Sequence, residues 1–113
     1  MKMLRPTLLM ILLAQPGFSV AEAPEQQPES ERQTQLRQLL AQDCSVCHGL
    51  LLKGDLGPPL TAKSLAGKSE HALVQIIIEG HEETAMPPWW WMLEEYEARW
   101  LVKFIRSIPI NGK

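Results

Sequence analysis

The sequence is poor in several residue types, and each shortage excludes a class of protein. Only two cysteines, three histidines and one tyrosine occur in 113 residues. No basic run is present and the formal net charge is −2, so nucleic-acid binding has no electrostatic support. No Ser/His/Asp set, pair of buried carboxylates or phosphate-binding loop is recognisable, and we therefore expect a protein that is not an enzyme.

Long hydrophobic runs are absent as well, and the apolar run near the start covers only residues 7–14. It follows Lys2 and Arg5 and precedes small residues that end at Ala21. This layout is typical of a secretory signal peptide, whereas a transmembrane helix needs about 20 apolar residues. We therefore predict a cleaved signal peptide over residues 1–21, export to the periplasm and no membrane anchor.

The residues after the predicted cleavage site lack large apolar side chains. Residues 22–29 contain two prolines and three glutamates, a composition that cannot bury enough surface to become ordered. We predict a flexible leader over residues 22–30 and one folded domain over residues 31–113. Such a domain has roughly 80 to 90 residues, a size at which a bound metal or cofactor often contributes to stability.

Helical periodicity is present in this domain, and sustained alternation at period two is not. Ser30 and Gln33 fit a capping box at the start of a first helix that runs into Cys44. One side of this helix carries Leu36, Leu39 and Leu40. We therefore expect the first helix to pack on the core and to deliver the cysteines.

Two further helices and one short helical turn are expected. Ser69 is placed to cap a helix over residues 70–79 that Gly80 ends, and the turn lies near residues 62–66. A last helix over about residues 93–107 carries an apolar stripe of Tyr96, Trp100, Leu101, Phe104, Ile105 and Ile108. The pattern predicts an all-α domain whose long loops wrap something.

The most informative motif is Cys-x-x-Cys-His, formed by Cys44, Cys47 and His48. It is the attachment signature for c-type haem. Two residues between the thiols on a helical turn let each sulfur reach one vinyl group of the porphyrin, and His48 then lies beneath the iron as a ligand. The motif predicts one covalently attached haem c.

Three other interpretations of the cysteine pair are weaker. A zinc site needs four ligands, and only His71 and His81 are left to complete one. A thioredoxin-like redox pair requires a βαβ context that the helical pattern does not supply. A disulfide between residues three apart would close a very small loop and constrain little.

The second axial ligand has four candidates, of which Met86 is favoured. Two prolines follow Met86 and restrict how far its loop can move. His81 is the alternative ligand, five residues earlier. We expect Met92 to fill a gap in the core beside the tryptophans, and His71 to be an ordinary, partly buried side chain.

Residues 36–108 resemble a small class I cytochrome c. The resemblance rests on Cys-x-x-Cys-His at residues 44–48, Gly-Pro-Pro-Leu at residues 57–60, Met-Pro at residues 86–87 and an aromatic-rich last helix. It implies a class I cytochrome c fold, with three main helices and short turns wrapped around one covalent haem. It also implies that the carbonyl of Pro58 orients His48 and makes its imidazole more basic.

One position departs from the family pattern. The family often has glycine eight residues before the first cysteine, where the first and last helices approach closely, and this chain has Leu36. We therefore expect either a wider crossing or a rotated first helix. The crossing should bring Leu40 against Trp100, Leu101 or Phe104.

Loop residues narrow the resemblance further. Residues 49–58, 84–89 and 98–102 are similar to the NirC-type cytochromes of denitrifying bacteria, which are associated with the nitrite reductase that carries haem c and haem d1. This resemblance implies a periplasmic single-electron carrier with no small-molecule substrate at the iron. Its redox partner would be a haem-d1 nitrite reductase or a haem d1 maturation protein.

Two other functions stay open. One is an accessory cytochrome in haem d1 maturation of the reductase. The other is a ligand-binding haem sensor or small peroxidase, which requires that Met86 be displaced.

Two surface features accompany the predicted ligand loop. Consecutive residues cannot all face one core, so at least one ring of Trp89 to Trp91 should be exposed. An exposed ring could dock a partner. The alternative interpretation is that the rings pack over the porphyrin and the last helix. Acidic residues cluster around the same loop, and we expect most of them to be solvated: Glu79, Glu82, Glu83, Glu94, Glu95 and Glu97.

Overall fold

The computed structural model describes residues 2–3, 11 and 13–109, and it is built from helices. The elements are α1 (Ser30–Leu39), a π-helical turn η1 (Leu40–Cys44), α2 (Ser45–His48), α3 (Ala62–Leu65), α4 (Glu70–Glu79) and α5 (Glu95–Ser107). The described residues contain no strand, and the all-α prediction is confirmed. None of the helices in this part of the chain has the length and apolar character that crossing a membrane requires.

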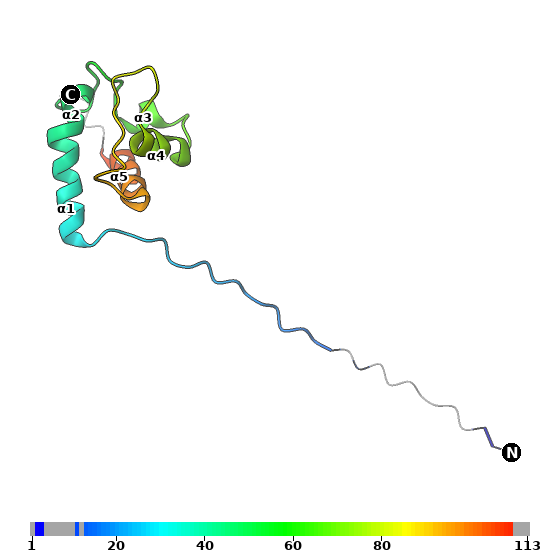
Figure 1. The fold of residues 1–113 in the computed structure, drawn as a ribbon. Helices are drawn as coiled ribbons and strands as arrows, with labels where there is room; N and C mark the ends of the chain where they lie inside the picture. Colours follow the sequence, from blue (N-terminus) through cyan, green and yellow to red (C-terminus); the bar gives the residue numbers. More distant parts are fainter. Residues whose placement is uncertain (1, 4–10, 12, 110–113) are drawn as a thin grey trace.

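The chain before α1 extends away from the helical body (Figure 1). Most of the apolar run predicted as a signal peptide, namely residues 7–10 and 12, lies outside the described residues, as do residues 110–113 at the end of the predicted domain. The last part of the predicted leader makes contacts with the body. Pro28 is buried, and Glu25 forms an ion pair with Lys103 of α5.

The first helix begins differently from the prediction. Ser30 is its first residue rather than its cap, and Glu29 occupies the cap position with no side-chain capping bond. The Gln33 side-chain amide donates instead to the carbonyl of Pro28 at 2.9 Å. The predicted capping box is therefore wrong, because Gln33 reaches past Ser30 to the preceding backbone.

The helix then continues through η1 and α2 to His48, so it delivers the cysteines as predicted. In η1 the backbone takes a wider turn, and the Ser45 hydroxyl donates to the carbonyl of Ala41 at 2.6 Å. A π turn adds a residue to one helical turn, and it therefore rotates every residue that follows. The side chains of the Cys-x-x-Cys-His motif therefore point in a different direction, about the helix axis, than they would after an unbroken α-helix.

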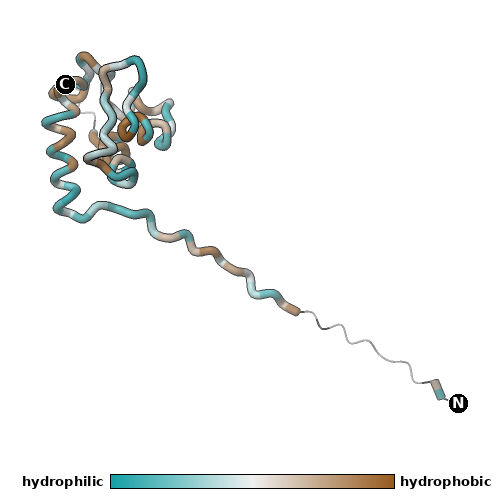
Figure 2. Tube along the Cα trace, viewed as in Figure 1, coloured by the Kyte–Doolittle hydropathy of each residue, from teal (hydrophilic) through white to brown (hydrophobic). Residues whose placement is uncertain are grey.

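The hydrophobic core joins α1, α4 and α5. Its buried residues are Leu36, Leu40, Leu65, Leu73, Val74, Leu93, Ala98, Leu101, Val102 and Ile105. Hydrophobic and hydrophilic residues alternate along α1, as expected for a helix with one buried side (Figure 2). Leu36, at the position where the family often has glycine, is 0% exposed.

Aromatic residues of α5 complete the contact with α1. Trp100 and Phe104 stack with their ring centroids 5.3 Å apart and pack against the core cluster that contains Leu40. The guanidinium of Arg37 lies over both rings, at 5.8 and 5.7 Å from their centroids. The first and last helices therefore share one apolar and cation–π contact.

Helix α4 has the predicted bounds, and the predicted cap is present. The Ser69 hydroxyl accepts from the backbone N–H of Ala72 at 3.1 Å. Helix α5 begins two residues later than predicted. The backbone N–H groups of Met92 and Leu93 both donate to the carbonyl of Trp89, at 2.9 Å each, so these residues belong to the preceding turn.

Candidate functional site

The residues of the Cys-x-x-Cys-His motif lie together at the end of the first helical segment. Neither thiol is in a disulfide, and Cys44, Cys47 and His48 are all half-buried. Burial, with a smaller contribution from the neighbouring Asp43 carboxylate, raises the pKa of the Cys44 thiol to about 11. This thiol is therefore neutral at physiological pH.

The imidazole of His48 is held by two consecutive residues of the loop that follows the motif. Its Nδ1 lies 2.7 Å from the carbonyl oxygen of Pro58. A carbonyl only accepts, so Nδ1 carries the proton and donates, which leaves the lone pair of Nε2 free to bind a metal. On one side the ring lies against Gly57, where an added Cβ would be 2.8 Å from Cε1 and 2.9 Å from Nδ1.

The loop that carries Gly57 is held by its own backbone. Gly57 N–H donates to the carbonyl of Cys47 at 2.7 Å, and Gly54 N–H donates to the carbonyl of His48 at 2.8 Å. Leu60 N–H closes the loop by donating to the carbonyl of Leu52 at 2.9 Å. We call residues 44–60 the proximal segment.

Met86 lies in the loop between α4 and α5, and we call residues 81–93 the distal loop. The Met86 side chain is half-buried. Its backbone N–H donates to the Thr84 hydroxyl at 3.3 Å, and its carbonyl accepts from the backbone N–H of His81 at 3.2 Å. These bonds form a tight turn just before the two prolines.

The distal loop doubles back on the end of α4. Trp89 N–H donates to the carbonyl of Ile77 at 3.0 Å, and Trp90 N–H donates to the carbonyl of Ile78 at 3.1 Å. Gly80 has a φ of +78° and packs directly on the loop backbone, because a Cβ there would lie 2.9 Å from Pro88 N and 3.0 Å from Met86 O. Only glycine adopts this conformation without strain and leaves room for the loop.

The other candidate ligands are at the surface. His81 is exposed, and so is His71, whose predicted partial burial is wrong because it lies on the outer side of α4. Met92 is 39% exposed, so its predicted place in the core is also wrong. Its side chain instead lines a shallow hollow against α1 with Arg32 and Gln35. No group of three or more His, Cys, Asp or Glu residues that could hold a metal ion occurs among the described residues.

Two tryptophans and most of the acidic residues near the distal loop are exposed. Trp90 and Trp91 are 68% and 61% exposed, which confirms that at least one ring faces solvent. Trp89 is half-buried and stacks on Trp91 with centroids 6.0 Å apart. The prediction that most of the acidic residues are solvated is confirmed, and Glu97 is the exception, since it is 5% exposed and pairs with Arg32.

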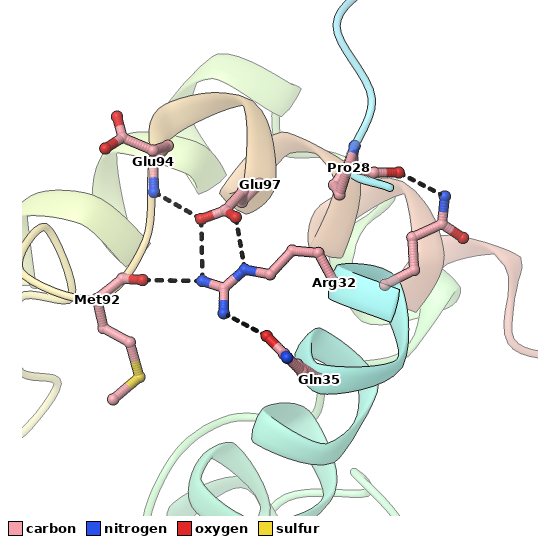
Figure 3. Close-up of polar contacts among 7 residues, drawn as sticks. Pro28, Arg32, Gln35, Met92, Glu94 and Glu97 are labelled. Carbon is pink, nitrogen blue, oxygen red and sulfur yellow. Dashed lines mark hydrogen bonds and ion pairs between the residues drawn. The ribbon is translucent and has the colours of Figure 1, made fainter. Parts of the chain in front are cut away.

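The Arg32–Glu97 pair joins the first turns of α1 and α5 (Figure 3). Arg32 Nε donates to Glu97 Oε1 at 2.6 Å, and Nη2 donates to Oε2 at 3.2 Å. The side-chain bond to Arg32 lowers the pKa of Glu97, and the same bond raises the pKa of Arg32. The position of Glu97 three residues after Glu94 could have indicated a helix start, but no local signal pairs it with a residue 65 positions away.

The donor set and the glycine at position 57 fit a covalently bound haem. Two free thiols three residues apart on one helix and an imidazole with its Nε2 lone pair available are the groups that such a cofactor needs. A thioether lies in a separate, restrained loop.

Comparison with known proteins identifies the family. Residues 31–105 match the family model described as "Cytochrome C oxidase, cbb3-type, subunit III". The chain belongs to this family of c-type cytochromes. Members of the family carry covalently attached haem c and move electrons, so this cytochrome is a haem-bearing electron carrier with an all-α class I cytochrome c fold.

Relatives of this cytochrome narrow the family. It is 50% identical over 78 residues to cytochrome c55X of Pseudomonas aeruginosa. The matched segment covers 69% of this chain and 66% of that relative, just under two thirds of the relative's length. The solved structure of the c-type cytochrome NirC matches with a TM-score of 0.68 and 49% identity, covering 69% of this chain and 92% of that one. The NirC resemblance stated from the loops is confirmed.

A larger protein contains a similar domain. The structure of dihydro-haem d1 dehydrogenase NirN in complex with DHE matches with a TM-score of 0.62 and 27% identity. The match covers 68% of this cytochrome and 17% of the dehydrogenase chain. A domain of this kind is therefore built into a protein named for haem d1 chemistry.

Proposed function

We propose that this cytochrome transfers single electrons in the periplasm, with its haem attached through Cys44 and Cys47 and with His48 and Met86 as axial ligands. The observation that carries the proposal is the orientation of His48, whose ring rests on Gly57 and donates to Pro58. The haem supplies the redox chemistry, since its iron cycles between the ferrous and ferric states.

Each residue has a separate task in this proposal. Pro58 fixes the imidazole tautomer and makes the ring a stronger donor, as outer-sphere partners of metal-bound histidines do. The Met86 thioether favours the reduced state and raises the reduction potential. If His48 and Met86 both bound the iron, no position on it would be left for a small molecule.

Substitution of Met86 tests the ligand assignment. Met86→Ala should lower the reduction potential and let carbon monoxide bind the ferrous protein, because a vacant or water-filled position replaces the thioether. Met92→Ala is the matched control, since it removes an exposed thioether six residues along the same loop. An unchanged spectrum in Met86→Ala would transfer the role to His81 or Met92.

Acid–acetone extraction tests the attachment. The exported protein should keep its haem after denaturation, whereas Cys44→Ala and Cys47→Ala should each remove one thioether bond. Release of the haem from the unsubstituted protein would reject covalent attachment.

We propose a haem-d1 nitrite reductase as the electron acceptor. The exposed rings of Trp90 and Trp91 would form the apolar centre of the contact. Exposed carboxylates lie in and directly after the distal loop, and a cationic partner would be steered by them: Glu82, Glu83, Glu94 and Glu95.

Stopped-flow reduction of the purified reductase across a salt series tests this partner. The rate should fall as salt shortens the Debye length from about 30 Å at 0.01 M to about 10 Å at 0.1 M. Glu82→Gln should flatten this dependence, whereas Glu31→Gln, on the exposed side of α1, is the control. Trp90→Ala should slow the reaction at every salt concentration, because it removes apolar contact and no charge.

A second candidate function is electron acceptance during haem d1 maturation. The similarity to part of NirN favours it, because a dehydrogenase must pass its electrons to an acceptor. One dihydro-haem d1 would then lose two electrons, and two molecules of this cytochrome would each accept one of them. A negligible rate with nitrite reductase at all salt concentrations, together with this stoichiometry in a reaction with the dehydrogenase, would favour the second function over the first.

A further inference from the structure

The guanidinium of Arg32 contacts the distal loop as well as Glu97. Its Nη2 donates to the carbonyl of Met92 at 3.0 Å, and its Nη1 donates to Gln35 Oε1 at 3.1 Å (Figure 3). One side chain of α1 is thus bonded to its own helix, to α5 and to the backbone of the distal loop.

The peptide that Arg32 holds belongs to a rigid turn. Met92 N–H donates to the carbonyl of Trp89 at 2.9 Å, and the indole N–H of Trp91 donates to the carbonyl of Pro88 at 3.1 Å. Proline restricts the backbone at the two residues after Met86. A loosening of Met92 therefore acts on Trp89, to which its N–H is bonded, and from Trp89 on Met86 through the two restricted prolines.

Arg32 itself has little freedom to move. The Glu97 side chain is only 6% exposed, and its Oε2 also accepts from Glu94 N–H at 2.9 Å. Glu97 is fixed by α5, so the guanidinium bonded to it in two places is fixed as well. The distal loop is consequently anchored to the junction of α1 and α5.

We infer that Arg32 is a positioning residue for Met86, and that this α1 side chain sets how often the Met86 thioether leaves the iron. The inference rests on the proposed ligation by Met86. The same stretch has a second anchor, between Met86 and Met92, in the bonds from Trp89 and Trp90 to the end of α4. Loss of Arg32 therefore removes one of two anchors, so Met86 should remain the ligand at equilibrium but dissociate faster.

Imidazole binding to the ferric holoprotein measures this dissociation. At saturating imidazole the observed rate equals the rate at which Met86 leaves, and loss of the sulfur-to-iron charge-transfer band reports it. Arg32→Gln should raise that rate about tenfold or more, because a charge-assisted hydrogen bond to the loop backbone is lost. Arg32→Lys keeps the positive charge but lacks the planar guanidinium with its several donors. Its imidazole rate should therefore lie between those of the unsubstituted protein and Arg32→Gln.

Two control variants separate this role from general stability. Arg99→Gln removes an arginine that pairs with Glu70 and Glu95 and makes no bond to the distal loop. Val102→Ala destabilises the buried core and removes no hydrogen bond or ion pair of the distal loop. Both should leave the imidazole rate within about twofold of the unsubstituted protein.

The outcomes distinguish the inference from its premise. Absence of the sulfur-to-iron band in the unsubstituted protein overturns the Met86 assignment and the inference with it. If the band is present but Arg32→Gln reacts no faster than Arg99→Gln, only the inference is overturned. Only the inference is overturned, too, if Val102→Ala binds imidazole as fast as Arg32→Gln when the two variants are compared at equal free energy of unfolding.

Discussion

The proximal segment orients His48 through contacts that are local in sequence, whereas the distal loop is held by residues from three helices. Pro58 and Gly57 lie ten and nine positions from the ring they hold. The distal loop depends on carbonyls at the end of α4, on the α5 carboxylate Glu97 and on Arg32 of α1. The proximal side is therefore a property of one segment, and the distal side is a property of the complete fold.

The largest effect should come from filling the space under His48. In Gly57→Ala the new Cβ would lie 2.8 Å from the ring, so the imidazole must move and its bond to Pro58 must lengthen. Overpacking of this kind costs about 1–3 kcal/mol, and we expect the haem-loaded yield to fall severalfold. Gly67→Ala, with nothing within 4 Å of the added methyl group, should load normally. Equal yields from the two variants would contradict the role of Gly57.

The corresponding distal change should leave attachment intact. Gly80→Ala forces a non-glycine residue to φ +78° and drives a methyl group against Pro88 N. This backbone conformation alone costs a non-glycine residue about 1–3 kcal/mol. We expect a lower reduction potential and a weaker sulfur-to-iron band, with covalently bound haem still detected by mass spectrometry. Complete loss of haem from Gly80→Ala would show that haem attachment at the proximal segment depends on the distal loop.

Acid should weaken the distal side through Glu97. The bond from Arg32 lowers the pKa of this carboxyl in the folded protein, so its stabilising contribution is complete above the unfolded value of about 4.3 and is lost as the pH falls through the lower folded value. The free energy of unfolding should therefore fall more steeply below pH 4.3 in the unsubstituted protein than in Glu97→Gln. Glu95→Gln, at an exposed pair, should follow the unsubstituted protein. Parallel curves for all three would refute the assignment.

The smallest effect should come from the contact between the leader and α5. Both partners of the Glu25–Lys103 pair are about half exposed. Exposed pairs contribute roughly 0–1 kcal/mol, so Lys103→Gln should shift the denaturant midpoint of unfolding only slightly. It should change neither the reduction potential nor the imidazole rate. A change in the reduction potential or in the imidazole rate would mean that the leader influences the proximal segment or the distal loop.

The same contrast explains which parts of the site could be predicted from the sequence. The helix α4 and the Cys-x-x-Cys-His motif depend on neighbours in the chain, so capping residues and spacing predicted them. The bond of His48 to Pro58 came from the family resemblance, and the structure has that contact.

The parts that could not be predicted depend on distant contacts. Glu97 resembled the other surface acids of its region because nothing local marks the approach of Arg32. Met92 resembled a core methionine, although its backbone is held in place and its side chain is exposed. The start of α1 was wrong by a single position, since a glutamine side chain competed for the backbone ahead of the helix.

The order of the chain has a consequence for biogenesis. Every residue that holds the His48 ring has been synthesised once Leu60 has been added to the chain, so the attachment site can form while the rest is still unfolded. The Arg32–Glu97 pair must close a loop of 65 residues and waits for the last helix. Maturation enzymes that attach haem would therefore meet an accessible motif early, and the distal loop with the proposed ligand Met86 would be fixed only in the final folding event.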